Sequence, residues 1–145
     1  MIILMIDVKS LLVLAVVTII LISCARIISK GVHGDKLLLT PYPCVNVEEF
    51  QSLIADPNVQ LLDVRTQEEF DEGHIAGALL VDVNDSAFVE KAIAVLDVNR
   101  PVAVYCRSGR RSARAASLLT ENHFKVTNLN GGVMAWQDAG KTLVK

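Results

Sequence analysis

The sequence has few of the features that indicate metal or nucleic-acid binding. It contains three cysteines, an odd number without short paired spacing, so neither a disulfide framework nor a zinc site is indicated. None of the three histidines falls at a metal-ligand spacing from a cysteine. The formal net charge is only −2, and the chain has no internal repeat and no low-complexity tract. We therefore expect no metal and no nucleic-acid partner, and the 145 residues predict one domain with a proper core.

A long apolar run stands near the N-terminus, where much of the 52% hydrophobic content gathers. Residues 10–25 carry no charged side chain, and residues 11–22 are apolar apart from Thr18. This run is short for a membrane span, which needs about twenty residues, and suits the core of a secretory signal. Residues 21–24, Leu-Ile-Ser-Cys, resemble the lipobox of bacterial lipoproteins. The resemblance implies cleavage before Cys24, lipid on that cysteine, and a protein anchored in the cell envelope and facing the periplasm.

Two other interpretations of the N-terminal segment stay open. In one, residues 1–24 remain as an uncleaved membrane anchor, and the basic residues between positions 26 and 36 favour a cytoplasmic domain by the positive-inside tendency. In the other, the small residues Ser23 and Ala25 mark an ordinary signal cleavage site, and cleavage there releases a soluble protein.

The rest of the chain divides into a linker and a domain. Residues 25–44 carry glycine, proline and mixed charges without clear periodicity, which is typical of a linker. In the domain, residues 45–145, short apolar runs alternate with helical patterns. The predicted elements are, in order, a helix after Asn46, a strand at 59–64, a helix at 66–72, a strand at 78–83, a helix at 86–96, a strand at 101–105, a helix at 112–122, a strand at 125–129 and a helix at 133–138. This alternation predicts an α/β fold with a mainly parallel sheet flanked by helices on both faces.

Two of the predicted helices start with a capping-box pattern. Asn46 is followed by Glu49, and Thr66 is followed by Glu69. In such a box the first side chain accepts a hydrogen bond from the helix backbone, and the glutamate reaches back to the N–H of the capping residue.

One stretch concentrates chemical groups, namely residues 105–112, Tyr-Cys-Arg-Ser-Gly-Arg-Arg-Ser. It joins the predicted strand at 101–105 to the predicted helix that begins at Ser112. Cys106 therefore lies at a strand-to-helix turn, where free backbone N–H groups and the positive end of the helix dipole favour a thiolate. Three arginines within five residues reinforce this effect and attract an anionic substrate. Gly109 lets the backbone fold tightly around whatever the sulfur holds.

Three spaced motifs run through the predicted domain. The first comprises residues 62–65 (Leu-Asp-Val-Arg), 69–70 (Glu-Phe) and 73–78 (Gly-His-Ile-Ala-Gly-Ala). The second is the cysteine loop at 106–112, and the third comprises residues 129–132 (Leu-Asn-Gly-Gly), 135–136 (Ala-Trp) and 139–140 (Ala-Gly). Together, and in this order, they resemble the single-domain rhodaneses, which are thiosulfate-type sulfurtransferases. The resemblance covers roughly residues 45–144. It implies a rhodanese-like sheet of five strands.

The resemblance also implies a sulfurtransferase with Cys106 as the catalytic residue. Its thiolate takes the sulfane sulfur of an anionic donor such as thiosulfate, and the resulting persulfide passes that sulfur to a thiol or cyanide acceptor. The substrate-binding residues implied are those of the loop: Arg107, Ser108, Gly109, Arg110, Arg111 and Ser112. We expect no cofactor, because the cysteine itself carries the sulfur. The expected partners are a small-molecule donor and a thiol acceptor, with a protein acceptor as the alternative, and the membrane through the N-terminus.

Three other functions stay open. Cysteine loops of phosphatases and arsenate reductases place the closing arginine six positions after the cysteine, where this chain has Ser112, whereas Arg111 closes a loop one residue smaller. A smaller ring of donors suits a single sulfur atom better than a phosphate group. An envelope persulfide carrier or redox partner would exchange sulfur with proteins. A non-enzymatic binding module is the least favoured function, because modules of that kind typically lack the cysteine.

Five residues outside the loop carry weaker signals. Asp63 and Arg65 end a predicted strand, and we expect them to support the site as an ion pair, which is largely architectural in the family. His74 is expected to hydrogen-bond loop backbone rather than act as a base. Trp136 is expected in the core or in a cleft wall. Cys44 would have to reach the loop cysteine to act as a resolving thiol.

Overall fold

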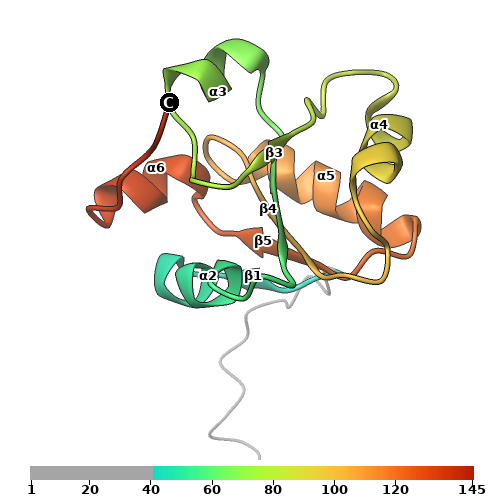
Figure 1. Ribbon diagram of the computed structural model, residues 1–145, viewed down its shortest axis with the longest axis horizontal. Coiled ribbons are helices and arrows are strands. Elements are labelled where there is room, and N and C mark those ends of the chain that lie inside the picture. The colour runs from blue at the N-terminus through green and yellow to red at the C-terminus, as the bar shows by residue number, and fades with distance from the viewer. Residues whose placement is uncertain (1–40) are drawn as a thin grey trace, which may run out of the picture. The chain divides into compact units, whose positions relative to one another are not determined.

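The computed structural model describes residues 41–145 of the chain (Figure 1). The predicted signal segment, residues 1–24, and the predicted lipidation site Cys24 lie outside the described residues, as does most of the predicted linker. Among the described residues, no helix combines the length and the apolar character that a membrane span requires.

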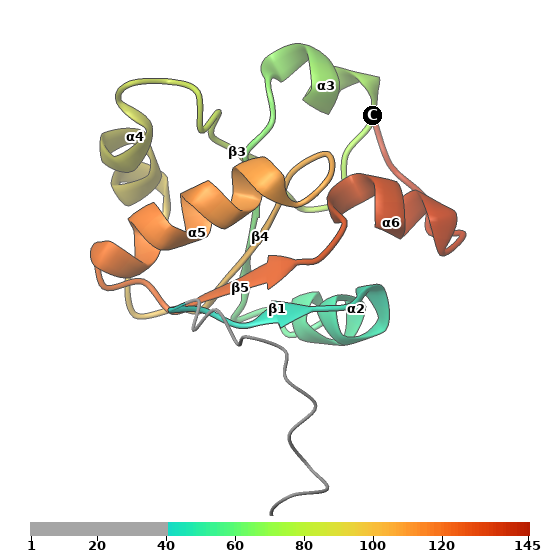
Figure 2. The ribbon, with the colours of Figure 1, turned by 180° about the vertical axis from the view of Figure 1, so that it is seen from behind.

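Five strands form one sheet, as the sequence and its resemblance predict (Figure 1 and Figure 2). They are β1 Cys44–Val45, β2 Gln60–Asp63, β3 Leu79–Leu80, β4 Val102–Tyr105 and β5 Val126–Leu129. The order across the sheet is β1-β5-β4-β2-β3, and every neighbouring pair is parallel. Parallel strands bring their carboxyl ends to one edge of the sheet, which is where ligands bind in open α/β folds. Because β4 is the central strand, it delivers Cys106 to the middle of that edge.

Helices cover both faces of the sheet. They are α2 Val47–Ile54, α3 Gln67–Glu72, α4 Phe88–Val95, α5 Arg110–Glu121 and α6 Gly132–Asp138. Buried residues of α4 and α5 pack on one face, and buried residues of α2 and α6 pack on the other. The side chains of β4 alternate between the two layers: Val102 and Val104 join the first, and Ala103 and Tyr105 join the second. Burial on both faces explains why this strand has a continuous apolar sequence.

The folded domain begins earlier than the sequence predicts. Tyr42 is 6% exposed within the core layer of α5, and its hydroxyl donates to the carbonyl of Ala113 at 2.8 Å. The strand β1, for which no residue pattern was identified in the sequence, starts at Cys44, a residue that we expected in the linker. Two residues are too few to show a periodic pattern, so this strand is defined by its pairing with β5 alone.

The second predicted strand is shorter than expected, and it is regular only over the two residues of β3. Beyond them, the N–H groups of Val81 and Val83 donate to the carbonyls of Asp63 and Val64 at 3.0 and 3.3 Å. The donors, Val81 and Val83, are two positions apart, whereas the acceptors, Asp63 and Val64, are adjacent. This mismatch resembles a β-bulge, and it ends the regular pairing of β3 with β2. Val81 and Val83 are nevertheless buried, which accounts for the apolar run that predicted a longer strand.

Both predicted capping boxes are present. At α2, the Asn46 side chain accepts the N–H of Glu49 at 2.9 Å, and the Glu49 carboxylate accepts the N–H of Asn46 at 3.1 Å. At α3, the corresponding bonds between Thr66 and Glu69 measure 3.3 and 3.2 Å. Residues three positions apart make all four bonds, so the local sequence suffices to predict them.

Candidate active site

Cys106 directly follows the last residue of β4, at the carboxyl edge of the sheet. The chain turns at residues 107–109, and Gly109 caps α5 with a left-handed φ of +92°. Glycine suits this conformation because it has no Cβ. The helix begins two residues before its predicted start, which places Ser112 in its first turn. Cys106 is 1% exposed, so the loop wraps almost completely around it.

Hydrogen-bond donors surround the Cys106 sulfur. The N–H of Gly109 donates to Sγ at 3.2 Å, and Oγ of Ser112 lies 3.4 Å from the same sulfur. That hydroxyl also lies 3.1 Å from the carbonyl oxygen of Gly109, so its single hydrogen serves one acceptor at a time. Burial by itself raises the pKa of the Cys106 thiol, but the Ser112 hydroxyl and the N–H groups of Ser112, Ser108 and Gly109 outweigh it and hold the pKa below its ordinary value. Hydrogen bonds, more than arginine side chains, therefore favour the thiolate here.

Replacing Ser112 with alanine is expected to raise the pKa of Cys106, because the variant loses the side-chain donor to the sulfur. The pH profile of Cys106 alkylation by iodoacetamide should move to higher pH, with a several-fold slower reaction at neutral pH. The reaction is followed by the mass of the Cys106 peptide. Ser117→Ala is the control, because the Ser117 hydroxyl bonds to the carbonyl of Ala113 further along the same helix. Overlapping profiles for Ser112→Ala and the unmodified protein would disprove the role of this hydroxyl.

The N-terminus of α6 packs against the main chain of the cysteine loop. The N–H of Val133 donates to the carbonyl of Cys106 at 2.8 Å, and the N–H of Met134 donates to that of Arg107 at 3.1 Å. Gly132 makes this close approach possible, because a Cβ there would lie 2.4 Å from the Cys106 carbonyl oxygen. The Leu-Asn-Gly-Gly motif thus brings the start of α6 against the cysteine loop, a contact that the sequence did not reveal.

The three arginines of the loop have three different environments. Arg111 forms a bidentate ion pair with Glu69 of α3, with two nitrogen–oxygen distances of 2.7 Å. Arg110 is exposed at the start of α5, and Arg107 lines a pocket beside the loop. From the sequence we expected all three to bind the anion, and we identified Glu69 as a capping residue and as part of the first motif, with no link to Arg111. Nothing in the local pattern could have revealed this pair, because its members lie 42 positions apart.

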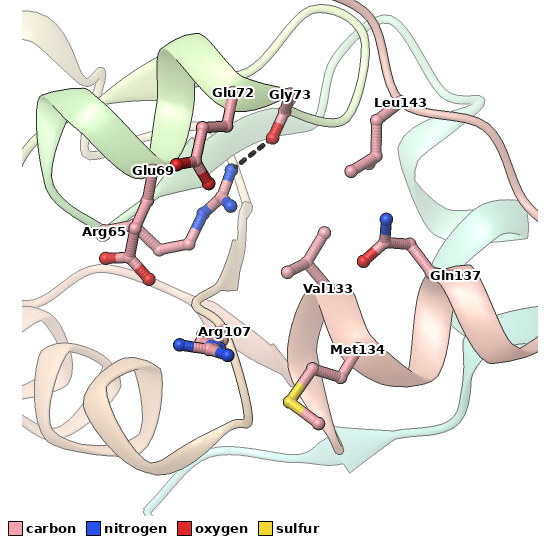
Figure 3. Close-up of a pocket in the computed structure, with 9 residues that line it drawn as sticks. All are labelled: Arg65, Glu69, Glu72, Gly73, Arg107, Val133, Met134, Gln137 and Leu143. Carbon is pink, nitrogen blue, oxygen red and sulfur yellow. Dashed lines mark hydrogen bonds between the residues drawn. The ribbon is translucent and has the colours of Figure 1, made fainter.

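An open pocket of about 330 Å³ adjoins the loop (Figure 3). Glu69 and Glu72 of α3 line one side, Val133 and Met134 of α6 line the other, and Arg107 lies between them. Within residues 41–145, no carboxylate forms an ion pair with Arg107. Its charge is therefore available to an anion that enters this pocket beside the cysteine loop.

Asp63 and Arg65 form a buried ion pair near the loop. The Arg65 Nη2 and the Asp63 Oδ2 are 2.6 Å apart, and the two side chains are 5% and 0% exposed. The same nitrogen donates to the carbonyl of Gly73 at 2.8 Å, and the guanidinium carbon lies 5.7 Å from the centre of the Tyr105 ring. The pair thus fixes the end of β2 to the turn after α3. Arg65 also lines the pocket, so the ion pair supports one of the pocket walls.

The other predicted residues make structural contacts. Nδ1 of His74 lies 3.1 Å from the carbonyl oxygen of Phe70, and the two rings stack. His74 thus contacts backbone as expected, but the backbone is that of helix α3 rather than of a loop. Trp136 is 6% exposed in the core, and its Nε1 donates to the carbonyl of Thr142 at 3.1 Å. In the described part of the chain, no group of three or more His, Cys, Asp or Glu side chains is placed to hold a metal ion.

Cys44 does not come close to the loop. It is exposed on β1 and pairs with Asn128 of β5, which in turn pairs with Val104 of β4. Two strand spacings amount to about 10 Å. The Cα atoms of a disulfide are roughly 4.4–6.8 Å apart, so the two cysteines could not form one without movement of the backbone.

The fold and the site together define a parallel α/β domain that holds a single buried cysteine at the carboxyl end of its central strand. Residues 46–139 match the rhodanese-like domain family, and the chain belongs to that family. It is 35% identical to the putative sulfurtransferase YtwF of Bacillus subtilis, over 63% of this chain and 85% of that protein. It is 33% identical to the thiosulfate sulfurtransferase GlpE of Shewanella oneidensis, over 70% of this chain and 98% of that protein.

Solved structures agree with the fold. A rhodanese-related protein from Thermoplasma volcanium superposes with a TM-score of 0.63 at 25% identity, covering 71% of this chain and 98% of that one. The family and its sulfurtransferase relatives together support sulfur transfer as the general activity.

Proposed function

We propose that the chain transfers sulfane sulfur from an anionic donor such as thiosulfate to a thiol or cyanide acceptor, through a persulfide on Cys106. The observation that carries the proposal is the Cys106 sulfur, which accepts the Gly109 N–H at 3.2 Å at the start of α5. A sulfur so placed is stabilised as the thiolate, which is the nucleophile that this chemistry needs. The thiosulfate sulfurtransferase among the relatives supports the choice of donor.

The proposed reaction takes two steps at one sulfur atom. In the first step, the Cys106 thiolate attacks the outer sulfur of thiosulfate, a new S–S bond forms, and sulfite leaves with the electron pair of the broken S–S bond. In the second step, a thiolate or cyanide attacks the outer sulfur of the persulfide, and Cys106 leaves as the thiolate. The Gly109 N–H and the Ser112 hydroxyl stabilise the negative charge on sulfur. No cofactor enters either step.

Arg107 and Arg110 are the proposed cations for the donor. Neither forms an ion pair with any carboxylate among residues 41–145. An unpaired guanidinium binds an oxyanion through charge-assisted hydrogen bonds. The sulfonate end of thiosulfate, and later the departing sulfite, would therefore lie toward Arg107 at the pocket.

Phosphatase or arsenate reductase chemistry is the alternative, and it has less support. The arginine that would close an oxyanion loop in this chain is Arg111, and both of its terminal nitrogens bind Glu69. Turnover of an aryl phosphate or of arsenate that is lost in Cys106→Ser would reverse this ranking. A persulfide carrier with protein partners would use the same Cys106 chemistry and differ only in its donor and acceptor.

We also propose that the N-terminal segment holds the domain at the cell envelope, with lipid on Cys24 and the domain facing the periplasm. The supporting feature is the lipobox pattern at residues 21–24. The alternative is an uncleaved anchor with a cytoplasmic domain. A mature N-terminal peptide that starts at Cys24 and carries lipid is expected by mass spectrometry of the membrane fraction, and an unprocessed N-terminus would favour the anchor.

The deciding experiment for the proposed activity measures the intact mass of the full chain after incubation with thiosulfate in the absence of reductant. We expect the intact mass to rise by one sulfur atom, peptide mapping to locate that atom on Cys106, and cyanide to remove it as thiocyanate. Cys44→Ser is the control, because it deletes the exposed thiol on β1 and leaves the loop unchanged. No adduct at any thiosulfate concentration would reject thiosulfate as the donor.

A further inference from the structure

We infer that Glu69 determines which anions the cysteine loop accepts, because it binds Arg111 and prevents that side chain from closing around an oxyanion inside the loop. This inference rests on the proposed sulfur-transfer function and adds a specificity-determining residue to it. Glu69 lies on α3, apart in sequence from the loop, and it is not a residue that the proposed reaction uses.

The geometry of the ion pair leaves little of Arg111 free. Its Nη1 binds Oε2 of Glu69 and its Nη2 binds Oε1, both at 2.7 Å. The side chains of Arg111 and Glu69 are 26% and 23% exposed, so most of the pair is shielded from solvent. Such a fork-to-fork pair is the strongest arrangement of these two groups, and any anion that binds Arg111 in the same way must displace Glu69.

Glu69 is also held from its other side. As the third residue of α3 it accepts the N–H of Thr66 at 3.2 Å, and its own N–H donates to the Thr66 hydroxyl at 3.3 Å. The hydrogen bonds from Arg111 are the largest of the effects that together lower the pKa of Glu69, so the carboxylate is ionised at neutral pH. The helix thus positions a fixed negative charge opposite Arg111 before any reactant arrives.

The charge of Arg111 would otherwise act on the loop. Arg111 is the second residue of α5, within the turn that holds the Cys106 sulfur, and attraction to Cys106 contributes to its raised pKa after the larger effect of Glu69. With Glu69 in place, the pair is neutral overall. The interior of the loop then offers N–H and hydroxyl donors, which suit one sulfur atom. A phosphate or arsenate bound there would lack the bidentate hydrogen bonds that a free Arg111 could supply.

The variant Glu69→Gln separates the ion pair from the helix cap. A glutamine completes a capping box as glutamate does, so the start of α3 is retained while the negative charge is lost. The chain contains a matched control in Glu49→Gln, because Glu49 completes the same box at α2 and none of the described arginines or lysines forms an ion pair with it. A loss that arises from a weaker cap would appear in both variants.

The readout is the protection of Cys106 from iodoacetamide by inorganic phosphate, together with the pH profile of the alkylation. In Glu69→Gln we expect phosphate to protect at roughly tenfold lower concentration, the factor that one hydrogen bond to a charged group supplies. The alkylation profile should also move to lower pH, because the Arg111 charge is no longer offset. Glu49→Gln should match the unmodified protein in both measurements. Equal phosphate protection in Glu69→Gln and the unmodified protein would overturn the inference.

The double variant Glu69→Gln/Arg111→Met tests the same inference, because it removes both charges of the pair and leaves no unpaired carboxylate beside the loop. If the stronger protection in Glu69→Gln comes from the freed Arg111, phosphate protection in the double variant should lie within about twofold of that in the unmodified protein. Tenfold stronger protection that persists in the double variant would show that Arg111 is not the group that binds phosphate and would defeat the inference. Neither measurement uses a sulfur donor, so failure of thiosulfate to form a persulfide would defeat the proposed function and leave this result unaffected.

Discussion

Replacing Cys106 with serine is expected to reduce sulfur transfer by about four orders of magnitude or more, the loss typical of a deleted catalytic nucleophile. A serine hydroxyl is far less acidic than a thiol, and it offers no sulfur with which to form a persulfide. Serine is close to cysteine in size, so the buried position and the packing of the loop should be retained. Folding is therefore expected to stay nearly unchanged while turnover of thiosulfate with cyanide disappears.

The control for this variant is Cys44→Ser. Cys44 is exposed on an edge strand and is separated from the loop by two strand spacings, so its loss should leave turnover within about twofold. Both variants are compared by thiocyanate formation and by thermal unfolding. A Cys106→Ser protein that keeps measurable turnover, or a Cys44→Ser protein that loses it, would show that the wrong cysteine has been assigned.

Replacing Gly132 with alanine is expected to disrupt the loop and to destabilise the fold together. The added Cβ would lie 2.4 Å from the carbonyl oxygen of Cys106 and 2.7 Å from the carbonyl carbon of Arg107. Both atoms are backbone, so the contact cannot be relieved by rotation of a side chain. Overpacking costs about 1–3 kcal/mol, and the left-handed φ of +60° adds roughly 1–2 kcal/mol for a residue with a Cβ. We expect the free energy of unfolding to fall by about 2–5 kcal/mol in total.

The catalytic effect of Gly132→Ala follows from the same displacement. The hydrogen bonds from Val133 and Met134 to the loop carbonyls require the close approach that the new methyl group prevents. A misplacement of about 1 Å at a reacting group costs on the order of 100-fold in rate, and we expect a loss of this size. Gly140→Ala at the other end of α6 is the control, because its φ is +73° and nothing lies within 4 Å of the added Cβ.

Comparing the two variants separates the cost of the left-handed backbone conformation from the cost of the steric contact with the loop. Gly140→Ala should show only the cost of the left-handed conformation and normal turnover, whereas Gly132→Ala should lose both stability and turnover. Chemical denaturation and the thiocyanate assay measure the two quantities. Equal behaviour of the two variants would mean that the approach of α6 to the loop does not matter to the site.

Elements made by neighbouring residues were predictable from the sequence. The boxes formed by Asn46 with Glu49 and by Thr66 with Glu69 are both present, because each joins residues three positions apart. The continuous apolar run at 101–105 correctly predicted a strand buried on both faces. Cys106 was predicted at a strand-to-helix turn because that turn needs only the strand before it and the helix after it.

The ends of strands and helices were less predictable where strand pairing or backbone conformation, rather than the pattern of apolar residues, sets them. β1 has two residues and no periodicity, so it became visible only in its pairing with β5. β3 ends after Leu80, because the pairing with β2 turns irregular while the apolar sequence continues. α5 begins at Arg110 rather than Ser112, because Gly109 adopts the left-handed conformation that caps it.

The sequence by itself determined the alternation of strands and helices, the place of the thiol at the end of a strand, and the strand-to-helix turn that holds it. Each of these depends on residues a few positions apart, whose hydrogen bonds and apolar periodicity act locally. Only the tertiary structure decided that Arg111 pairs with Glu69, and that Gly132 lies against the Cys106 carbonyl. These contacts join segments that are far apart in the sequence and that only the folded chain brings together. Their geometry depends on how α3 and α6 pack, which no local pattern of residues encodes.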